Sequence, residues 1–251
     1  MSLIRVERDG PVRHVILDRA DKRNALTDEM MQEVRALFLA EPAEDERATV
    51  IRGEGPSFCA GLELATTGID PEAAQLIQSM FDAVQRYPLP VVARVQGVAI
   101  AGGCELALHC DFTVAADSAS FAMPLAQIGV ATTWFLTKKI MEAAGPVMGR
   151  EILLLGDPID APRLVDLGII HRAVPEADLD GAVDAVVRRL TANAPLSLKA
   201  MKAIILKQMS IYDLPEHAEE AAFADAIWET EDAVEGVRAR VEKRKPVFQG
   251  K

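Results

Sequence analysis

The sequence is poor in the residues that build metal centres and disulfide frameworks. Its 251 residues include three cysteines, Cys59, Cys104 and Cys110, and only four histidines. Neither residue type recurs at the spacing of metal ligands, and three cysteines do not make a paired framework. We therefore expect no metal site. We expect the cysteines to pack as small hydrophobic residues in a reducing compartment.

Long hydrophobic runs are also missing. No stretch reaches eighteen consecutive apolar residues, which argues against a membrane span. The opening sequence, MSLIRVERDG, has no basic segment followed by an apolar one, so no signal peptide is expected and the protein is predicted to be cytoplasmic. The formal net charge of −11 argues against a nucleic-acid partner. An anionic ligand would have to be held by local cations or helix ends.

What the chain does have is apolar residues, at 50% of the total, which is enough for a large core. Strand patterns alternate with helical ones as far as a hinge at residues 193–195, and only helical patterns follow it. The alternation indicates an α/β body, and a doubly wound sheet fits it. The expected strands are Leu3–Glu7, Val12–Leu17 (forming a hairpin with the first), Thr49–Arg52, Pro90–Val95, Phe112–Ala115 and Ile169–Val174.

Helices are expected where apolar residues recur with helical spacing between capping or breaking residues. Thr27 is expected to cap the first of them, and Gly145 and Pro146 are expected to stop the third. The expected helices run from Thr27 to Phe38 or Leu39 and over Pro71–Gln85, Thr132–Ala144, Met148–Leu155, Ala161–Leu167, Leu179–Ala192, Ser197–Gln208, Pro215–Trp228 and Asp232–Arg244.

The stretch Val91–Phe121 carries the most informative pattern. An apolar strand passes through a run of small residues to Gly103, where a helix is expected to begin, and a single acid, Glu105, follows in an apolar run. Backbone N–H groups at such a turn favour negative charge. Burying an unpaired carboxylate is costly, so Glu105 is either a hydrogen-bonded structural residue or a group placed beside a ligand.

Four ordered motifs make the chain resemble the crotonase (enoyl-CoA hydratase/isomerase) superfamily. They are Asn24-Ala25-Leu26, the segment FCAGLEL at residues 58–64, the segment GGCELA at residues 102–107, and Glu242-Lys243-Arg244-Lys245. The resemblance implies an α/β (α+β) fold: a spiral of ββα units with a C-terminal helical oligomerisation domain. It divides the chain into a core at residues 1–194 and a helical region at residues 195–251, and it implies a homotrimer or a dimer of trimers.

The resemblance also implies the ligand and the groups that bind it. Members of the superfamily bind acyl-CoA thioesters, so coenzyme A is part of the substrate and no separate cofactor is expected. By resemblance, the thioester carbonyl accepts hydrogen bonds from the backbone N–H groups of Ala60 and Gly102, which would stabilise an enolate. The CoA and acyl contacts implied by position are Ala25, Ala60, Leu62, Leu64, Gly102, Leu125 and Trp134.

The sequence differs from the family pattern at one catalytic position. Glu105 matches one of the two carboxylates that hydrate an enoyl-CoA, but Leu125 stands where the second belongs. We therefore expect a hydratase-like lyase with one carboxylate and reduced activity. The alternatives are an enoyl-CoA double-bond isomerase and an acyl-CoA-binding protein without catalysis. His109, one helical turn after Glu105, either orients that carboxylate or is an ordinary core histidine.

Overall fold

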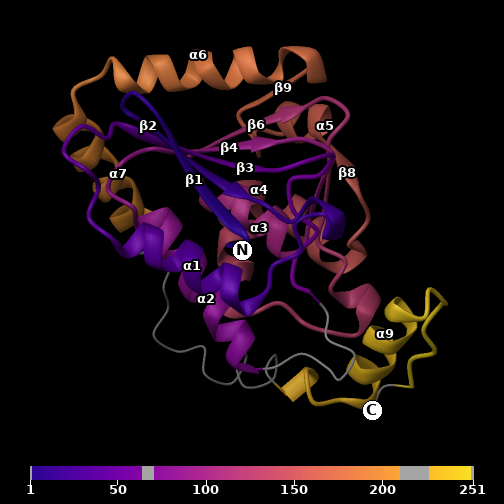
Figure 1. Ribbon diagram of the computed structural model, residues 1–251. Coiled ribbons are helices and arrows are strands. Elements are labelled where there is room, and N and C mark those ends of the chain that lie inside the picture. The colour runs from indigo at the N-terminus through magenta and orange to yellow at the C-terminus, as the bar shows by residue number, and fades with distance from the viewer. Residues whose placement is uncertain (1, 64–70, 210–225, 250–251) are drawn as a thin grey trace.

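The computed structural model describes residues 2–63, 71–209 and 226–249 (Figure 1). Its largest sheet has six strands in the order β1-β2-β3-β4-β6-β9. The first two strands form the expected antiparallel hairpin, and the others pair in parallel. The strands are β1 (Ile4–Asp9), β2 (Val12–Leu17), β3 (Ala48–Gly53), β4 (Val91–Val95), β6 (Phe112–Ala116) and β9 (Arg172–Val174).

A second sheet of three short strands was not expected from the sequence. It contains β5 (Val98–Ile100), β7 (Ser120–Ala122) and β8 (Ile159–Asp160), in the order β5-β7-β8. The chain leaves β4 and enters β5 by turning at Gly97, where φ is 61° and an added Cβ atom would lie 2.0 Å from the Pro56 carbonyl oxygen. The succession β4-β5-α3 is one strand–strand–helix unit.

The strand order excludes the doubly wound sheet that the sequence pattern alone allows. The order proceeds in one direction across the large sheet, whereas a doubly wound sheet reverses direction. Figure 1 shows α6 on one side of this sheet and α1, α2 and α3 on the other. The fold is the crotonase-like arrangement expected from the resemblance.

Most expected helices are present close to the expected bounds. Thr27 caps the first of them by accepting a hydrogen bond from the Met30 amide, as predicted. Short helical turns lie at η1 (Ala20–Lys22), η2 (Ala126–Ile128), η3 (Glu151–Leu155) and η4 (Glu176–Asp178). The longer helices are α1 (Asp28–Leu39), α2 (Pro71–Arg86), α3 (Gly102–His109), α4 (Trp134–Arg150), α5 (Ala161–Asp166), α6 (Leu179–Thr191), α7 (Pro195–Met209) and α9 (Glu231–Val241).

The expected stop of this helix at Gly145 and Pro146 is confirmed. Gly145 has non-helical angles (φ 65°, ψ 176°), so α4 consists of two helical pieces, the second of which runs to Arg150. Proline is well tolerated in the first turn of a helix, so Pro146 begins the continuation and the pair produces a kink. Of the expected helix Pro215–Trp228, residues 215–225 lie outside the described residues.

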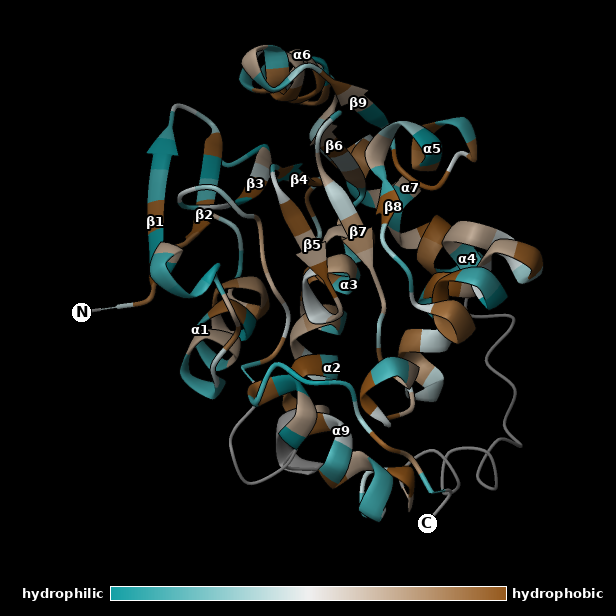
Figure 2. Cartoon of the chain, turned by 90° about the vertical axis from the view of Figure 1, so that its right-hand side faces the viewer, coloured by the Kyte–Doolittle hydropathy of each residue, from teal (hydrophilic) through white to brown (hydrophobic). Residues whose placement is uncertain are grey.

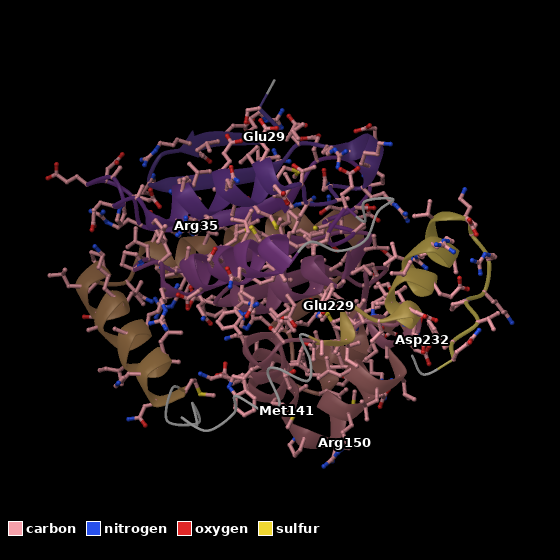
Figure 3. The ribbon with its side chains drawn as sticks, turned by 90° about the horizontal axis from the view of Figure 1, so that it is seen from below. Glu29, Arg35, Met141, Arg150, Glu229 and Asp232 are labelled. Atoms are coloured by element: carbon pink, nitrogen blue, oxygen red, sulfur yellow. The ribbon has the colours of Figure 1, made fainter. Side chains whose placement is uncertain are left out.

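The C-terminal helix α9 packs closely on the turn η2. An added Cβ atom at Gly236 would lie 2.1 Å from the Ile128 carbonyl oxygen, and one at Gly129 would lie 2.5 Å from that of Asp232. Figure 3 shows this end of the molecule, with Glu229 just before α9 and Asp232 in its first turn. The C-terminal region therefore contacts the core of its own chain. The division between residues 194 and 195 stays a prediction.

The core lies mainly between the large sheet and the helices below it. Figure 2 shows hydrophobic residues on the central strands and hydrophilic residues on α1 and α9. In the described ranges no helix is long and apolar enough to cross a bilayer. Side chains that are almost completely buried in the core include Leu17, Met31, Ile51, Phe58, Phe81 and Leu106.

Candidate active site

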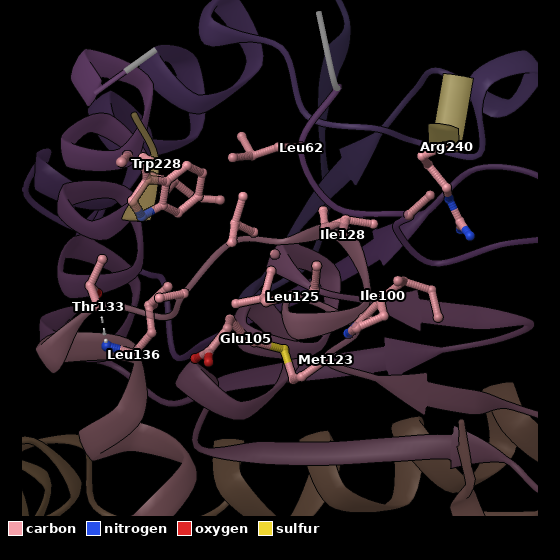
Figure 4. A pocket seen from close by; sticks show the side chains of 18 residues that line it. Leu62, Ile100, Glu105, Met123, Leu125, Ile128, Thr133, Leu136, Trp228 and Arg240 are labelled. Carbon is pink, nitrogen blue, oxygen red and sulfur yellow. Dashed lines mark hydrogen bonds between the residues drawn. The ribbon is translucent and has the colours of Figure 1, made fainter. Parts of the chain in front are cut away.

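A cavity of about 110 Å³ lies beside the N-terminus of α3 (Figure 4). Its wall combines residues from the loop after β3, from α2, from the segment after β7 and from the C-terminal region. Apolar side chains form most of this wall, among them Leu62, Ile77, Ile100, Met123, Leu125 and Ile128. The setting is mainly apolar, and polar groups that reach it interact strongly because apolar side chains screen charge less than water does.

Glu105 is the acid of this cavity. It lies in the first turn of α3, and its side chain is 0% exposed. Among the described residues, neither of its carboxyl oxygens has a hydrogen-bond partner. Burial raises the pKa of Glu105 well above its usual value, and the charge of nearby Lys139 offsets only part of that effect. The structural explanation for Glu105 is therefore not supported, because a structural carboxyl group would be paired.

Two backbone segments meet at the same wall. Gly102 is the first residue of α3, so its N–H group has no carbonyl one turn earlier to bond with. An added Cβ atom at Gly61 would lie 3.3 Å from the Gly102 nitrogen and 2.8 Å from the Ile100 carbonyl oxygen. Gly61 also has a φ of 89°. Only glycine fits both the close contacts and the positive φ, so Gly61 allows the loop after β3 to approach the start of α3.

The residue after Gly61 offers a second free amide. Leu62 pairs with Leu26 as an isolated parallel bridge. That bridge uses the Leu26 N–H group bonded to the Gly61 oxygen (2.8 Å) and the Glu63 N–H group bonded to the Leu26 oxygen (2.9 Å). It leaves the Leu62 N–H group without a protein acceptor in the part of the chain described here. Leu62 and Gly102 both line the cavity.

The prediction that Ala60 supplies a hydrogen-bond donor to the ligand is wrong in this structure. The Ala60 N–H group already donates to the carbonyl oxygen of Arg23 at 3.0 Å. Ala60 lines the cavity, but its amide is used within the protein. The sequence predicts Leu62 only as a contact of CoA, and the availability of its amide depends on this long-range pairing, which has no local sequence signal.

The backbone is strained where it enters α3. Ala101, the N-cap of the helix, has φ 47° and ψ −114°, which are unusual angles for a residue with a Cβ atom. Its N–H group is fixed by a 2.7 Å hydrogen bond to the Ala122 oxygen. Strain of this kind persists where surrounding contacts enforce it, and it is common at functional sites.

Leu125 lies in the cavity wall, at the position where the family resemblance places a second acid. Of the described lining residues, only Glu105 and Arg240 ionise, and Figure 4 shows them on different sides of the cavity. The Thr133 hydroxyl accepts the Leu136 N–H group as a helix cap at 3.3 Å. A water molecule beside Glu105 would find no second carboxylate in this wall.

The remaining expected contacts are scattered. Trp134 does not line this cavity but a separate pocket with Thr137 and Met141. Ala25 is outside the cavity wall, and its carbonyl oxygen accepts a hydrogen bond from Arg19 at 3.2 Å. Leu64 lies outside the described residues. The tryptophan that does line the cavity is Trp228, which the sequence did not single out as a site residue.

The other reactive side chains do not provide an alternative site. Cys59, Cys104 and Cys110 are free and buried, and burial raises the pKa of the Cys59 thiol to about 12. Such thiols are poor nucleophiles at neutral pH. Over the described residues, no group of histidines, cysteines and acids could hold a metal ion. Glu105 and the two free amides are therefore the groups in the described residues that could carry out chemistry in this cavity.

Known proteins have a similar fold and a similar sequence. The family model described as enoyl-CoA hydratase/isomerase matches residues 7–251. An enoyl-CoA isomerase/hydratase from Mycosarcoma maydis is 30% identical and covers 96% of this chain and 93% of its own. An enoyl-CoA hydratase structure from Mycobacterium smegmatis is 30% identical, covers 98% of both chains and has a TM-score of 0.78.

A methylmalonyl-CoA decarboxylase complexed with 2S-carboxypropyl-CoA superposes with a TM-score of 0.91, covering 100% of this chain and 99% of that one. At 23% identity, this likeness concerns the fold alone. The family match spans nearly the whole chain and includes the segments that carry Leu62, Gly102 and Glu105. The chain belongs to the enoyl-CoA hydratase/isomerase family.

Proposed function

We propose that the protein hydrates an enoyl-CoA thioester with one carboxylate and two backbone N–H donors. The observation that carries the proposal is the buried Glu105, whose carboxyl oxygens accept no hydrogen bond from the described residues, beside the free amides of Leu62 and Gly102. A carboxyl group kept without a partner in an apolar cavity has a cost that binding a reacting molecule would offset. Coenzyme A would enter as part of the substrate, without a separate cofactor.

The two amides would act on the thioester carbonyl. As water adds at Cβ, negative charge moves onto the carbonyl oxygen to give an enolate. The N–H groups of Leu62 and Gly102 would donate to that oxygen, and the N-terminus of α3 would favour the same charge. Each donor of this type stabilises a transition state by roughly 3–4 kcal/mol.

Glu105 would accept and donate the protons of the reaction. In its carboxylate form it accepts a proton from the water whose oxygen bonds to Cβ. The protonated carboxyl then donates a proton to Cα, which regenerates the carboxylate and completes the addition of one water molecule. This sequence asks one group to act first as base and then as acid, because Leu125 has no proton to give or take.

Leu125→Glu should increase hydration. A missing acid–base group costs about two orders of magnitude or more, so the wild-type protein should turn over well below two-acid family members. The glutamate variant restores a carboxylate that can share the water with Glu105. Leu125→Gln is the matched control, because glutamine has similar size and polarity but no titratable proton.

The measurement is steady-state hydration of crotonyl-CoA and longer 2-enoyl-CoAs by the three proteins. Wild-type hydration as fast as that of a typical two-acid member would contradict the proposal of a one-carboxylate hydratase. Equal gains in the glutamate and glutamine variants would show that polarity, and not a second acid, limits the reaction.

A second candidate function is double-bond isomerisation. A specific observation favours it: apart from Glu105, the cavity offers little to hold a water molecule, and one carboxyl group can move a proton between two carbons. Incubation with 3-enoyl-CoA and 2-enoyl-CoA separates the two, since an isomerase forms the conjugated product without adding water. Calorimetric binding of acyl-CoA without turnover would instead indicate a binding protein.

The contacts to the rest of CoA are also part of the proposal. Ala25, Ala60 and Leu64 would lie along the pantetheine or adenine, as the family resemblance implies. Of these, Ala60 lines the cavity, and Leu62 beside it would combine a contact with its role as donor.

We also propose assembly into a homotrimer or a dimer of trimers. Helix α7 exposes Leu196, Met201, Ile204 and Ile205, at 52–77% of their surfaces, and closed symmetry would bury them. Sedimentation should show trimers or hexamers at micromolar concentration. Ile204→Glu should shift the protein toward monomers, whereas Ala203→Glu, an exposed position about 100° around the same helix, should do so much less. A stable wild-type monomer would contradict the proposal.

A further inference from the structure

His109 is held in one orientation behind the catalytic carboxyl group. Its side chain is completely buried on the last turn of α3. The Phe81 ring stacks on the imidazole at 5.0 Å with an interplanar angle of 12°, and the Phe135 ring stacks at 5.2 Å and 15°. Two parallel aromatic contacts prevent the imidazole from turning freely.

The hydrogen bonding of His109 defines its tautomer. Nδ1 lies 2.8 Å from the carbonyl oxygen of Glu105, and a carbonyl oxygen can only accept, so Nδ1 carries the proton. The same Nδ1 lies 3.5 Å from Oε2 of Glu105. The N–H group therefore donates to the backbone carbonyl of Glu105, and the carboxyl oxygen lies beside it without a hydrogen bond.

The charge state of the imidazole follows from its surroundings. Burial lowers the pKa of His109 well below its usual value, and the charge of Lys139 lowers it further. Nε2 is buried and has no partner among the described residues. His109 is therefore a neutral donor to the backbone carbonyl of Glu105, and it does not line the cavity itself.

We propose that His109 is a positioning residue: when Glu105 ionises, its Oε2 would share the Nδ1–H group with the backbone carbonyl, which would orient the carboxylate and favour the form that accepts the proton of water. The assignment rests on the proposed hydration. Leu125 offers no polar group at the second-acid position, and the Nδ1 atom of His109 lies 3.5 Å from Oε2 of Glu105, close enough for a small movement to make it a donor to the carboxylate.

The other titratable or charged groups near His109 and Glu105 should affect the wild type and the variants in the same way. Lys139 on α4 affects both residues and pairs with Glu142, its Nζ lying 3.0 Å from Oε2 of that residue. Cys104 adjoins Glu105 on α3, and burial keeps its thiol protonated. Arg240 lines another part of the cavity. None of them is altered by a substitution at residue 109.

The test compares His109→Asn with His109→Leu. The Asn Nδ2 group occupies nearly the position of the histidine Nδ1 and keeps an N–H donor, whereas Leu has a similar size and no donor. Both variants lose the imidazole ring that stacks between Phe81 and Phe135. If the leucine variant does not fold, His109→Ala replaces it as the variant without a donor.

Two readouts are needed. The first is the pKa of the Glu105 carboxyl, followed by ¹³C NMR and assigned with Glu105→Gln; the second is the pH profile of hydration. Removing a donor that favours the ionised form should raise the carboxyl pKa, so the leucine variant should titrate roughly 0.5–1 pH unit higher. The rise of activity with pH should move up equally. The asparagine variant should titrate as the wild type does.

An unchanged carboxyl pKa in the leucine variant would overturn the proposal. So would equal shifts in the leucine and asparagine variants, because these would show that packing, and not the N–H group, sets the pKa. The NMR titration does not require turnover. If hydration is absent altogether, the proposed function fails, while the titration still decides whether His109 acts on Glu105.

Discussion

Replacing Glu105 with glutamine should lower hydration by about 10²–10⁴-fold, the usual contribution of a positioned acid–base group. The carboxylate is the only ionisable acid found in the described cavity wall, and glutamine keeps its size but cannot take the proton of water. Steady-state hydration of a 2-enoyl-CoA provides the measurement. Glu176→Gln, which removes an exposed acid far from the cavity, is the control.

Glu105→Gln should also stabilise the folded protein, so unfolding would not explain its loss of hydration activity. Burial raises the pKa of Glu105 above the unfolded value of 4.5, so the folded state retains a proton that the unfolded state has lost. Stability therefore falls as pH rises from 4.5 to the folded pKa, by up to about 1.4 kcal/mol per pH unit. Glu105→Gln removes this loss, and its stability advantage over the wild type in urea should grow across that range.

Two results would contradict the role of Glu105. A glutamine variant that hydrates as fast as the wild type would show that another group takes the proton. A glutamine variant that loses activity but becomes less stable at every pH would mean that the carboxyl group has a structural role in the folded protein.

Replacing Gly102 with proline should lower turnover by about 10²–10³-fold, the usual effect of removing one donor to a developing oxyanion. Proline lacks the N–H group, and it is tolerated at the first position of a helix, which is where Gly102 lies. Loss of the donor should lower kcat more than it weakens thioester binding, because the carbonyl oxygen gains its charge only during the reaction.

Gly102→Ala is the matched control for the added side-chain atoms. A Cβ atom there would lie 2.8 Å from Cδ1 of Ile77, the flexible end of a side chain, so a small shift accommodates it. The alanine variant keeps the N–H group and should retain much more activity than the proline variant. Equal turnover by the two, with thermal unfolding measured for both, would refute the role of the Gly102 amide.

Local signals in the sequence were sufficient for several elements. A hydroxyl residue followed by acidic residues placed the cap of α1 at Thr27, and the apolar alternation around Gly10 placed the first hairpin. The run of small residues before Gly103 placed the start of α3 within one residue of its observed position. Such features depend on near neighbours, so the sequence determines them directly.

The second sheet was missed for a physical reason. Strands of only a few residues, such as β5, β7 and β8, show no periodicity that distinguishes them from loops. Their pairing partners are distant in sequence, as when Val98 pairs with Ser120.

By itself, the sequence determined the family, the position of Glu105 at the start of a helix, and the presence of leucine at residue 125. Only the tertiary structure decided which amides are free. The Ala60 N–H group is bonded to Arg23, whereas the Leu62 N–H group is not bonded, and both facts follow from pairing between segments far apart in the chain. The tertiary structure also brought Trp228 to the cavity and directed the His109 N–H group at Glu105. A backbone donor has no side chain to reveal it, so its availability depends entirely on which carbonyl oxygens the fold brings within reach.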